Sequence, residues 1–171
     1  MPTIGAPAPA FDCTAVLDGK VVELDWRQLH ENKILVLIFD AVESNVLTIQ
    51  SVEARSRELE EVDRLQGKLA VVFRDHVFEI LTWTDQLPDS SGTGDAQLPF
   101  IVDTDHWISS MYDMVAGQGE TLWGHVIIDP IGRLRQVTMH TNPVETNMEE
   151  LVRCLTSIRD EWSEAGHVFE C

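Results

Sequence analysis

Cysteine is scarce in this sequence, which has only Cys13, Cys154 and Cys171 among its 171 residues. None belongs to a C-x-x-C pair, and three scattered thiols are too few for the disulfide framework of a small secreted domain. The sequence therefore excludes a fold that depends on cross-links. We expect a reducing compartment, and a cytoplasmic location is the simplest choice.

Long apolar runs are missing as well. No segment approaches the ~20 residues that a membrane-spanning helix requires. The opening residues contain no basic segment followed by an apolar stretch, which is the pattern of a secretory signal. We therefore expect a soluble protein without a membrane partner.

Positive charge is in short supply. Lys and Arg number 12 against 29 Asp and Glu, which gives a formal net charge of −17. Nucleic acids and anionic lipid surfaces are bound chiefly through Lys and Arg, so neither is an expected partner. The charge serves solubility in the simplest interpretation, and an acidic face for a basic protein partner is the alternative.

Metal-binding patterns are also absent. The six histidines show no pairing at three- or four-residue spacing on one predicted helix, so a zinc or iron site has no support, and each is interpreted as a surface or hydrogen-bonded residue. We expect neither a bound metal nor a cofactor. The histidines are His30, His76, His106, His125, His140 and His167.

What the sequence does contain is enough apolar material for a core. Hydrophobic residues make up 44% and charged residues 24%, within the ordinary range for globular proteins. A chain of this length fits one domain, spanning residues 1–171, and no internal repeat is visible. Residues 88–95 are rich in turn-forming residues and are predicted to be a loop rather than a linker.

The order of the apolar segments indicates the fold class. Residues 33–39 form a continuous apolar run, typical of a strand covered on both faces. Residues 46–65 have the spacing of an amphipathic helix, with Ser44 and Asn45 as candidate N-caps. Residues 69–73 form a second buried run. A strand, a helix and a strand in that order predict a right-handed parallel crossover.

The remaining segments add a hairpin and a closing helix. The predicted elements are helices over residues 77–84, 106–115 and 148–158 and strands over residues 100–102, 125–128 and 134–139. The turn Asp129-Pro130-Ile131-Gly132 makes the last two strands an antiparallel hairpin. The expected architecture is α/β and thioredoxin-like, a central mixed sheet flanked by helices.

Several motifs resemble those of the typical two-cysteine peroxiredoxins, the AhpC/TSA-like family. They occur in the family's order and at nearly its spacing from Ile4 to about Phe169, so the resemblance implies the peroxiredoxin type of thioredoxin-like fold. The motifs are G-x-x-A-P-x-F at Gly5–Phe11, the first hairpin at Asp18-Gly19, D-S-x-F-x-x-x-x-W at 75–83, P-L-L-A-D at 99–103, G-x-F-I-I-D-x-x-G-x-L-R-Q at 124–136 and L-P-V at 142–144.

The resemblance also places the family's active site on this chain. Peroxiredoxins reduce peroxide with a thiolate held at P-x-x-x-T-x-x-C, at the first turn of the long helix, and supported by an arginine from a later strand. Aligned here, the proline falls on Ala41, the threonine on Asn45, the attacking cysteine on Thr48 and the arginine on Trp123. All four positions differ. The chain therefore resembles a divergent member that lacks the catalytic cysteine.

The remaining cysteines offer weak substitutes. The family's resolving cysteine aligns near Phe169, two residues before Cys171, which is either a displaced resolving cysteine or an exposed terminal thiol. Cys13 and Cys154 are interpreted as packed small hydrophobes. An indole at Trp123 would fill the family's pocket with apolar bulk and remove its positive charge.

These observations lead to two hypotheses. The first is a non-catalytic peroxiredoxin-like protein that acts through homo-oligomeric assembly or partner binding, as a structural or chaperone-like subunit. The alternative is a thiol peroxidase, which would depend on thioredoxin, or a redox sensor, using Cys13, Cys154 or Cys171. The resemblance implies a homodimer joined through the strand at residues 134–139, with a larger ring as a further option, and the protein partner is not identified.

Overall fold

The computed structural model describes residues 2–40, 49–85, 98–117, 119–142 and 146–167. Strands and helices alternate along most of this length. The strands are β1 (Cys13–Leu17), β2 (Lys20–Leu24), β3 (Ile34–Asp40), β4 (Gly67–Phe73), β5 (Phe100–Val102), β6 (Trp123–Ile128) and β7 (Leu134–His140). The helices are α1 (Trp26–His30), α2 (Ile49–Arg64), α3 (Val77–Asp85), α4 (Trp107–Met111) and α5 (Met148–Glu164).

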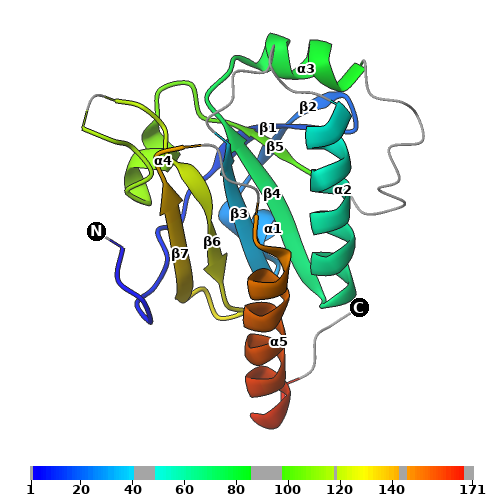
Figure 1. Ribbon diagram of the computed structural model, residues 1–171, viewed down its shortest axis with the longest axis vertical. Helices are drawn as coiled ribbons and strands as arrows, with labels where there is room; N and C mark the ends of the chain where they lie inside the picture. Colours follow the sequence, from blue (N-terminus) through cyan, green and yellow to red (C-terminus); the bar gives the residue numbers. More distant parts are fainter. Residues whose placement is uncertain (1, 41–48, 86–97, 118, 143–145, 168–171) are drawn as a thin grey trace.

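The strands form one mixed sheet in the order β2-β1-β5-β4-β3-β6-β7. β3 pairs in parallel with β4 and antiparallel with β6. The predicted crossover and the predicted hairpin are therefore joined at β3, inside the sheet. β7 lies at one edge, and α2 and α5 lie side by side on one face (Figure 1). The expected α/β architecture, a central mixed sheet flanked by helices, is confirmed.

β3 is buried along its entire length because both faces of the sheet are covered. Its residues alternate between two clusters: Ile34, Val36 and Ile38 pack toward α2 and α5, whereas Leu35, Leu37 and Phe39 pack toward α1 and α4. This alternation follows from the two-residue period of a strand. A continuous apolar run is therefore what a central strand needs.

α5 begins at a side-chain cap and packs along one face. Asn147 is the N-cap, and its side-chain oxygen accepts a hydrogen bond from the backbone N–H of Glu150. Leu151, Leu155 and Ile158 follow at helical spacing and are buried in the core. The cap fixes where the helix starts, and its first turn therefore lies beside β6 and β7.

The prediction of a helix over residues 106–115 is wrong in its extent, since α4 ends at Met111. Asp113 then adopts a left-handed conformation with φ 56°, and Val115 pairs with Thr121 across a short antiparallel bridge. Asp103, buried beside the helix start, accepts backbone hydrogen bonds from Ile108 and from Ser109. Helix α4 is thus anchored at its start by the Asp103 carboxylate, and it ends where the chain reverses direction after Asp113.

Most other predicted elements are confirmed within a residue or two, but α5 continues beyond the predicted end at residue 158 to Glu164. The helix predicted over residues 46–65 is α2 as far as the structure describes it, and the strand predicted to start at residue 69 begins two residues earlier. The candidate caps Ser44 and Asn45 and the predicted loop at residues 88–95 lie outside the described residues.

Candidate functional site

Trp123 is the one family-equivalent site position that the structure describes. It is half-buried at the first residue of β6, and its cross-strand partner is His140 of β7. The substituted positions Ala41, Asn45 and Thr48 lie outside the described residues, as do Phe169 and Cys171. Their aligned roles therefore stay predictions.

Trp123 forms part of the wall of a cavity of about 340 Å³, which we call the β6–β7–α5 pocket. Its lining comes from β3, β6, β7 and the first turn of α5. The lining residues are Ile38, Phe39, Trp123, Gly124, His125, Gln136, Thr138, His140, Thr146, Asn147 and Glu150. Sequence reasoning treated His125 and His140 separately and did not find this pocket. The two-residue period of the hairpin strands could have indicated it, because alternate residues of a strand share one face of the sheet.

His125 is the buried titratable group of this pocket, with 6% of its surface exposed. Burial, together with the nearby His140, lowers the pKa of His125 from 6.5 to about 4. The Nε2 atom of His125 lies 3.4 Å from the Thr138 hydroxyl, which also accepts a hydrogen bond from the Gln136 amide at 3.3 Å. The imidazole is therefore neutral at pH 7.

The protonation of His125 makes stability depend on pH. Its pKa is about 4 when folded against 6.5 for the free side chain, so the unfolded chain takes up a proton first as pH falls. Above pH 6.5 the neutral, buried His125 contributes its full share, about 3 kcal/mol, to the free energy of unfolding. This share is lost as the pH falls from 6.5 to 4. Urea unfolding across this range measures it.

A matched pair of variants isolates this contribution. His125→Leu should flatten the pH dependence of the unfolding free energy between pH 6.5 and 4, whereas His76→Leu, at an exposed position, should leave it as in the wild type. The same slope in wild type and His125→Leu would contradict the assignment. His140 and Glu150 also act on His125, so the comparison is made with both in place.

Glu150 supplies the carboxylate of the pocket. A two-pronged hydrogen bond from Arg153, with Nε–Oε2 at 2.9 Å and Nη2–Oε1 at 2.7 Å, lowers the pKa of Glu150. No lysine or arginine is among the described residues that line the pocket. Its polar groups are therefore a carboxylate, two imidazoles, and amides and hydroxyls that can both donate and accept hydrogen bonds, beside apolar surface that includes an indole.

The two described thiols lie away from this pocket in apolar packing. Cys13 on β1 is buried, and burial, with the nearby Glu23 and Asp12, raises its pKa to about 12. Cys154 on α5 is half-buried against the core, and burial again raises its pKa. A raised pKa suppresses the thiolate, which is the reactive form of cysteine.

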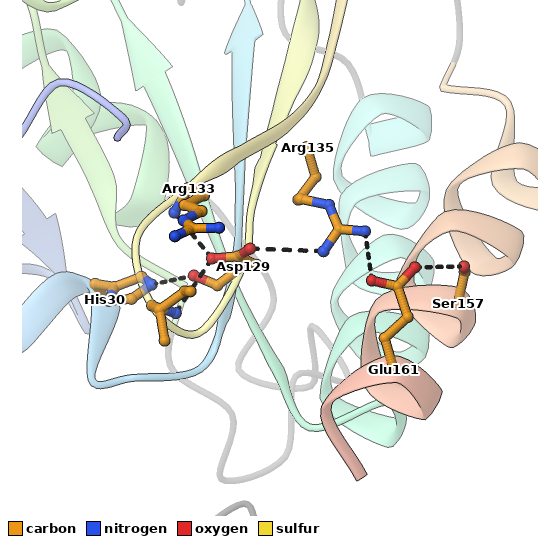
Figure 2. A network of polar contacts seen from close by, with 7 residues as sticks. His30, Asp129, Arg133, Arg135, Ser157 and Glu161 are labelled. Atoms are coloured by element: carbon orange, nitrogen blue, oxygen red, sulfur yellow. Dashed lines mark hydrogen bonds and ion pairs between the residues drawn. The ribbon is translucent and has the colours of Figure 1, made fainter. Parts of the chain in front are cut away.

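A polar network fixes the β6–β7 hairpin against its neighbours (Figure 2). The buried Asp129 carboxylate accepts backbone hydrogen bonds within its own turn, from Ile131 at 3.2 Å and Arg133 at 2.8 Å. Arg135 joins Asp129, at 3.5 Å, to Glu161 of α5, at 2.7 Å. These ties join the turn end of the hairpin to the later turns of α5, whereas the pocket lies at the other end of both elements.

His30 completes this network from the other face of the sheet. Its Nε2 atom lies 2.8 Å from the backbone oxygen of Asp129, and its ring stacks on Trp26 with centroids 5.4 Å apart. The sequence prediction of a hydrogen-bonded histidine is confirmed at this position. The hairpin turn is thus held both by α1 and by α5.

Among the described residues no group of three or more His, Cys, Asp or Glu side chains could hold a metal ion. In the same ranges no helix is long and apolar enough to cross a membrane.

Comparison with curated proteins finds relatives along most of the chain. Peroxiredoxin prdx-2 of Caenorhabditis elegans is 31% identical over 157 residues, which cover 91% of this chain and 78% of that protein. Peroxiredoxin TSA1-B of Candida albicans is 29% identical over 159 residues, covering 92% of this chain and 81% of that protein. No family model matches the chain.

Solved structures show the same fold at lower identity. AhpC of Enterococcus faecalis superposes with a TM-score of 0.79 at 18% identity, covering 100% of this chain and 99% of that one. The reduced 2-Cys peroxiredoxin of Plasmodium vivax superposes with a TM-score of 0.78 at 21% identity, covering 94% and 98%. The arrangement of sheet and helices is therefore shared throughout.

Proposed function

The chain belongs to the peroxiredoxin family, and we propose that within it this protein is a non-catalytic member that acts through homo-oligomeric assembly or partner binding, as a structural or chaperone-like subunit. The observation that carries the proposal is the state of the thiols. The aligned site of attack, Thr48, has no sulfur, and both described cysteines have raised pKa values.

Reduction of peroxide by a cysteine depends on the fraction of that cysteine that is present as thiolate. Peroxide is attacked by the thiolate, and a pKa of about 12 leaves roughly one Cys13 side chain in 100,000 ionised at pH 7. Sulfenic acid, the first product of that attack, also needs room beside the sulfur. Cys13 lies with 7% of its surface exposed in a packed cluster, so it offers neither the anion nor the access.

Assembly is proposed to proceed through β7. This strand lies at the edge of the sheet, where its outer backbone groups can pair with a second copy across a two-fold axis. The N-terminal segment covers only the beginning of this edge, through the hydrogen bonds of Gly5 and Ala6 with Leu134. We also propose that residues 1–171 form one domain and that the protein is cytoplasmic.

We expect a symmetric homodimer at micromolar concentration, measured by light scattering. Hydrogen exchange on the same samples should show β7 amides beyond Leu134 that lose protection on dilution, because an intermolecular pair would protect the outer edge that the N-terminal segment leaves uncovered. A monomer mass at these concentrations would sink the proposal of assembly through β7. A mass of several dimers would indicate the larger ring.

The alternative function is a thiol peroxidase or redox sensor, and membership of the peroxiredoxin family is the observation that favours it. Such an enzyme would use Cys171, which lies outside the described residues, or Cys13 or Cys154 after a rearrangement. It would take its electrons from thioredoxin. The chemistry at Thr48 would remain absent in any case.

Peroxide consumption in the presence of thioredoxin and its reductase separates the two functions. We expect no turnover above a buffer control, for the wild type and for Cys13→Ser, Cys154→Ser and Cys171→Ser alike, and no peroxide-dependent dimer on a nonreducing gel. Turnover that disappears with one of the three substitutions would establish the alternative. A specific dimer abolished by Cys171→Ser would do the same.

A further inference from the structure

The β6–β7–α5 pocket is a concave site whose surface is largely apolar with several polar groups, and Trp123 alone among its described lining residues is a position aligned with the family's site. Its volume of about 340 Å³ lies at the small end of the range for ligand sites, which begins near 300 Å³. The pocket lies between two strands of the hairpin and the capped start of α5, and the Asp129, Arg135 and Glu161 network joins the same elements at their other ends. The cavity is thus built between elements of regular secondary structure.

The lining selects against anions. Glu150 carries a negative charge, His125 is neutral because burial lowers its pKa, and no described lining residue is a lysine or arginine. The formal net charge of −17 adds a repulsive field for any anion that approaches. A carboxylate or phosphate would enter this pocket without a positive partner.

The same lining is suited to a flat cation. The indole of Trp123 attracts a cation placed over its face. The carboxylate of Glu150 accepts charge-assisted hydrogen bonds, and its two oxygens have lone pairs beyond those that Arg153 uses. The hydroxyl oxygen of Thr138 in β7, which lies beside His125 of β6, is a further acceptor.

We propose that the β6–β7–α5 pocket binds a planar organic cation of the amidinium or guanidinium class, held between the ring of Trp123 and the carboxylate of Glu150. The cation is supplied either by a small molecule or by an arginine side chain of a partner protein, since both present the same charged plane. Cation binding here uses no thiol, so it stands whether or not the protein reduces peroxide, although Trp123 is also the position aligned with the family's arginine.

Three matched probes test the charge preference. Benzamidine, benzamide and benzoate share one ring and carry a positive, a neutral and a negative substituent respectively. We expect ¹H–¹⁵N NMR titration of the whole chain to show millimolar or tighter binding for benzamidine, at least about fivefold weaker binding for benzamide, and none for benzoate. The indole N–H signal of Trp123, identified by its loss in Trp123→Leu, should shift on binding.

The variants locate the site. Glu150→Gln and Trp123→Leu should each weaken benzamidine binding by about fivefold or more, whereas Glu149→Gln, exposed on the same turn of α5, should not change it. Arg153→Gln should strengthen binding, because it frees the Glu150 carboxylate from a surface ion pair. Thermal unfolding of each variant verifies that it is folded.

The source of the cation is separated by a fourth probe, arginine capped at both termini. Affinity comparable to that of benzamidine indicates a partner's arginine side chain, and much weaker binding indicates a small aromatic cation. Binding of benzoate as tight as that of benzamidine would overturn the proposal. Absence of benzamidine binding at 10 mM, or binding indifferent to both Glu150→Gln and Trp123→Leu in folded protein, would overturn it equally.

Discussion

Thr48→Cys alone is expected to leave peroxide turnover negligible, whereas the triple variant Thr48→Cys, Asn45→Thr, Trp123→Arg is expected to turn over measurably. The single substitution installs sulfur but none of the groups that keep it ionised. Stopped-flow peroxide reduction measures the series. Family-like rates from the single variant would show that the site is still organised for catalysis and that this account of Trp123 is wrong.

The electrostatics of β6 and β7 explain this expectation. The position aligned with the family's arginine is Trp123, and its neighbours on that face of the hairpin include His125, which burial keeps neutral. An indole is apolar bulk, and desolvation raises a thiol pKa. The start of a helix favours the anion by under about 1 kcal/mol, which is less than one pKa unit. A cation has to be supplied by substitution.

A double variant serves as the control for this series. Thr48→Cys with Trp123→Lys adds a positive charge at the same position without the fixed fork of donors that arginine presents. We expect it to lower the thiol pKa, measured by the pH dependence of alkylation, with less gain in turnover than Trp123→Arg. An alkylation profile that matches Thr48→Cys in both this double variant and the triple variant would show that position 123 does not act on the thiol.

Gly124→Ala is expected to destabilise the protein by about 3–5 kcal/mol, seen as a lower midpoint of urea unfolding. Gly124 has φ 155°, and a Cβ atom there would overlap the backbone carbonyl of Thr138 in β7. The β7 backbone cannot move away without breaking the pairing of Gly124 with Met139 and of its neighbours in the ladder. The family's G-x-F motif thus corresponds to a close approach of two strands.

Gly132→Ala, in the turn of the same hairpin, is the matched control. Gly132 also has a positive φ, 82°, but a Cβ atom there would meet nothing within 4 Å. Its cost should be about 1 kcal/mol, the conformational term alone. Equal losses of unfolding free energy in the two variants would show that the structure relieves the overlap with Thr138. The close approach of the two strands would then not explain why position 124 is a glycine.

The sequence predicted most of the fold because the signals it carries are local. The apolar run over residues 34–39 of β3, a Pro and Gly turn between β6 and β7, and helical spacing in α5 each define an element within a few neighbours. The helix over residues 106–115 was predicted too long because the signal for its end is not local. Its end depends on the pairing of Val115 with Thr121, and periodicity alone does not reveal that contact.

The proposed loss of the catalytic thiol rests on the sequence alone, because the aligned residue, a threonine at position 48, has no sulfur. Tertiary structure decided what depends on burial and on distant contacts. Cys13 has a raised pKa because β1 is covered, and His125 is neutral because the sheet and α5 exclude water around it. Trp123 and Glu150, 27 positions apart, share a pocket only because α5 starts beside the hairpin. Residue type sets which reactions a side chain can undergo, and packing sets its charge and its neighbours.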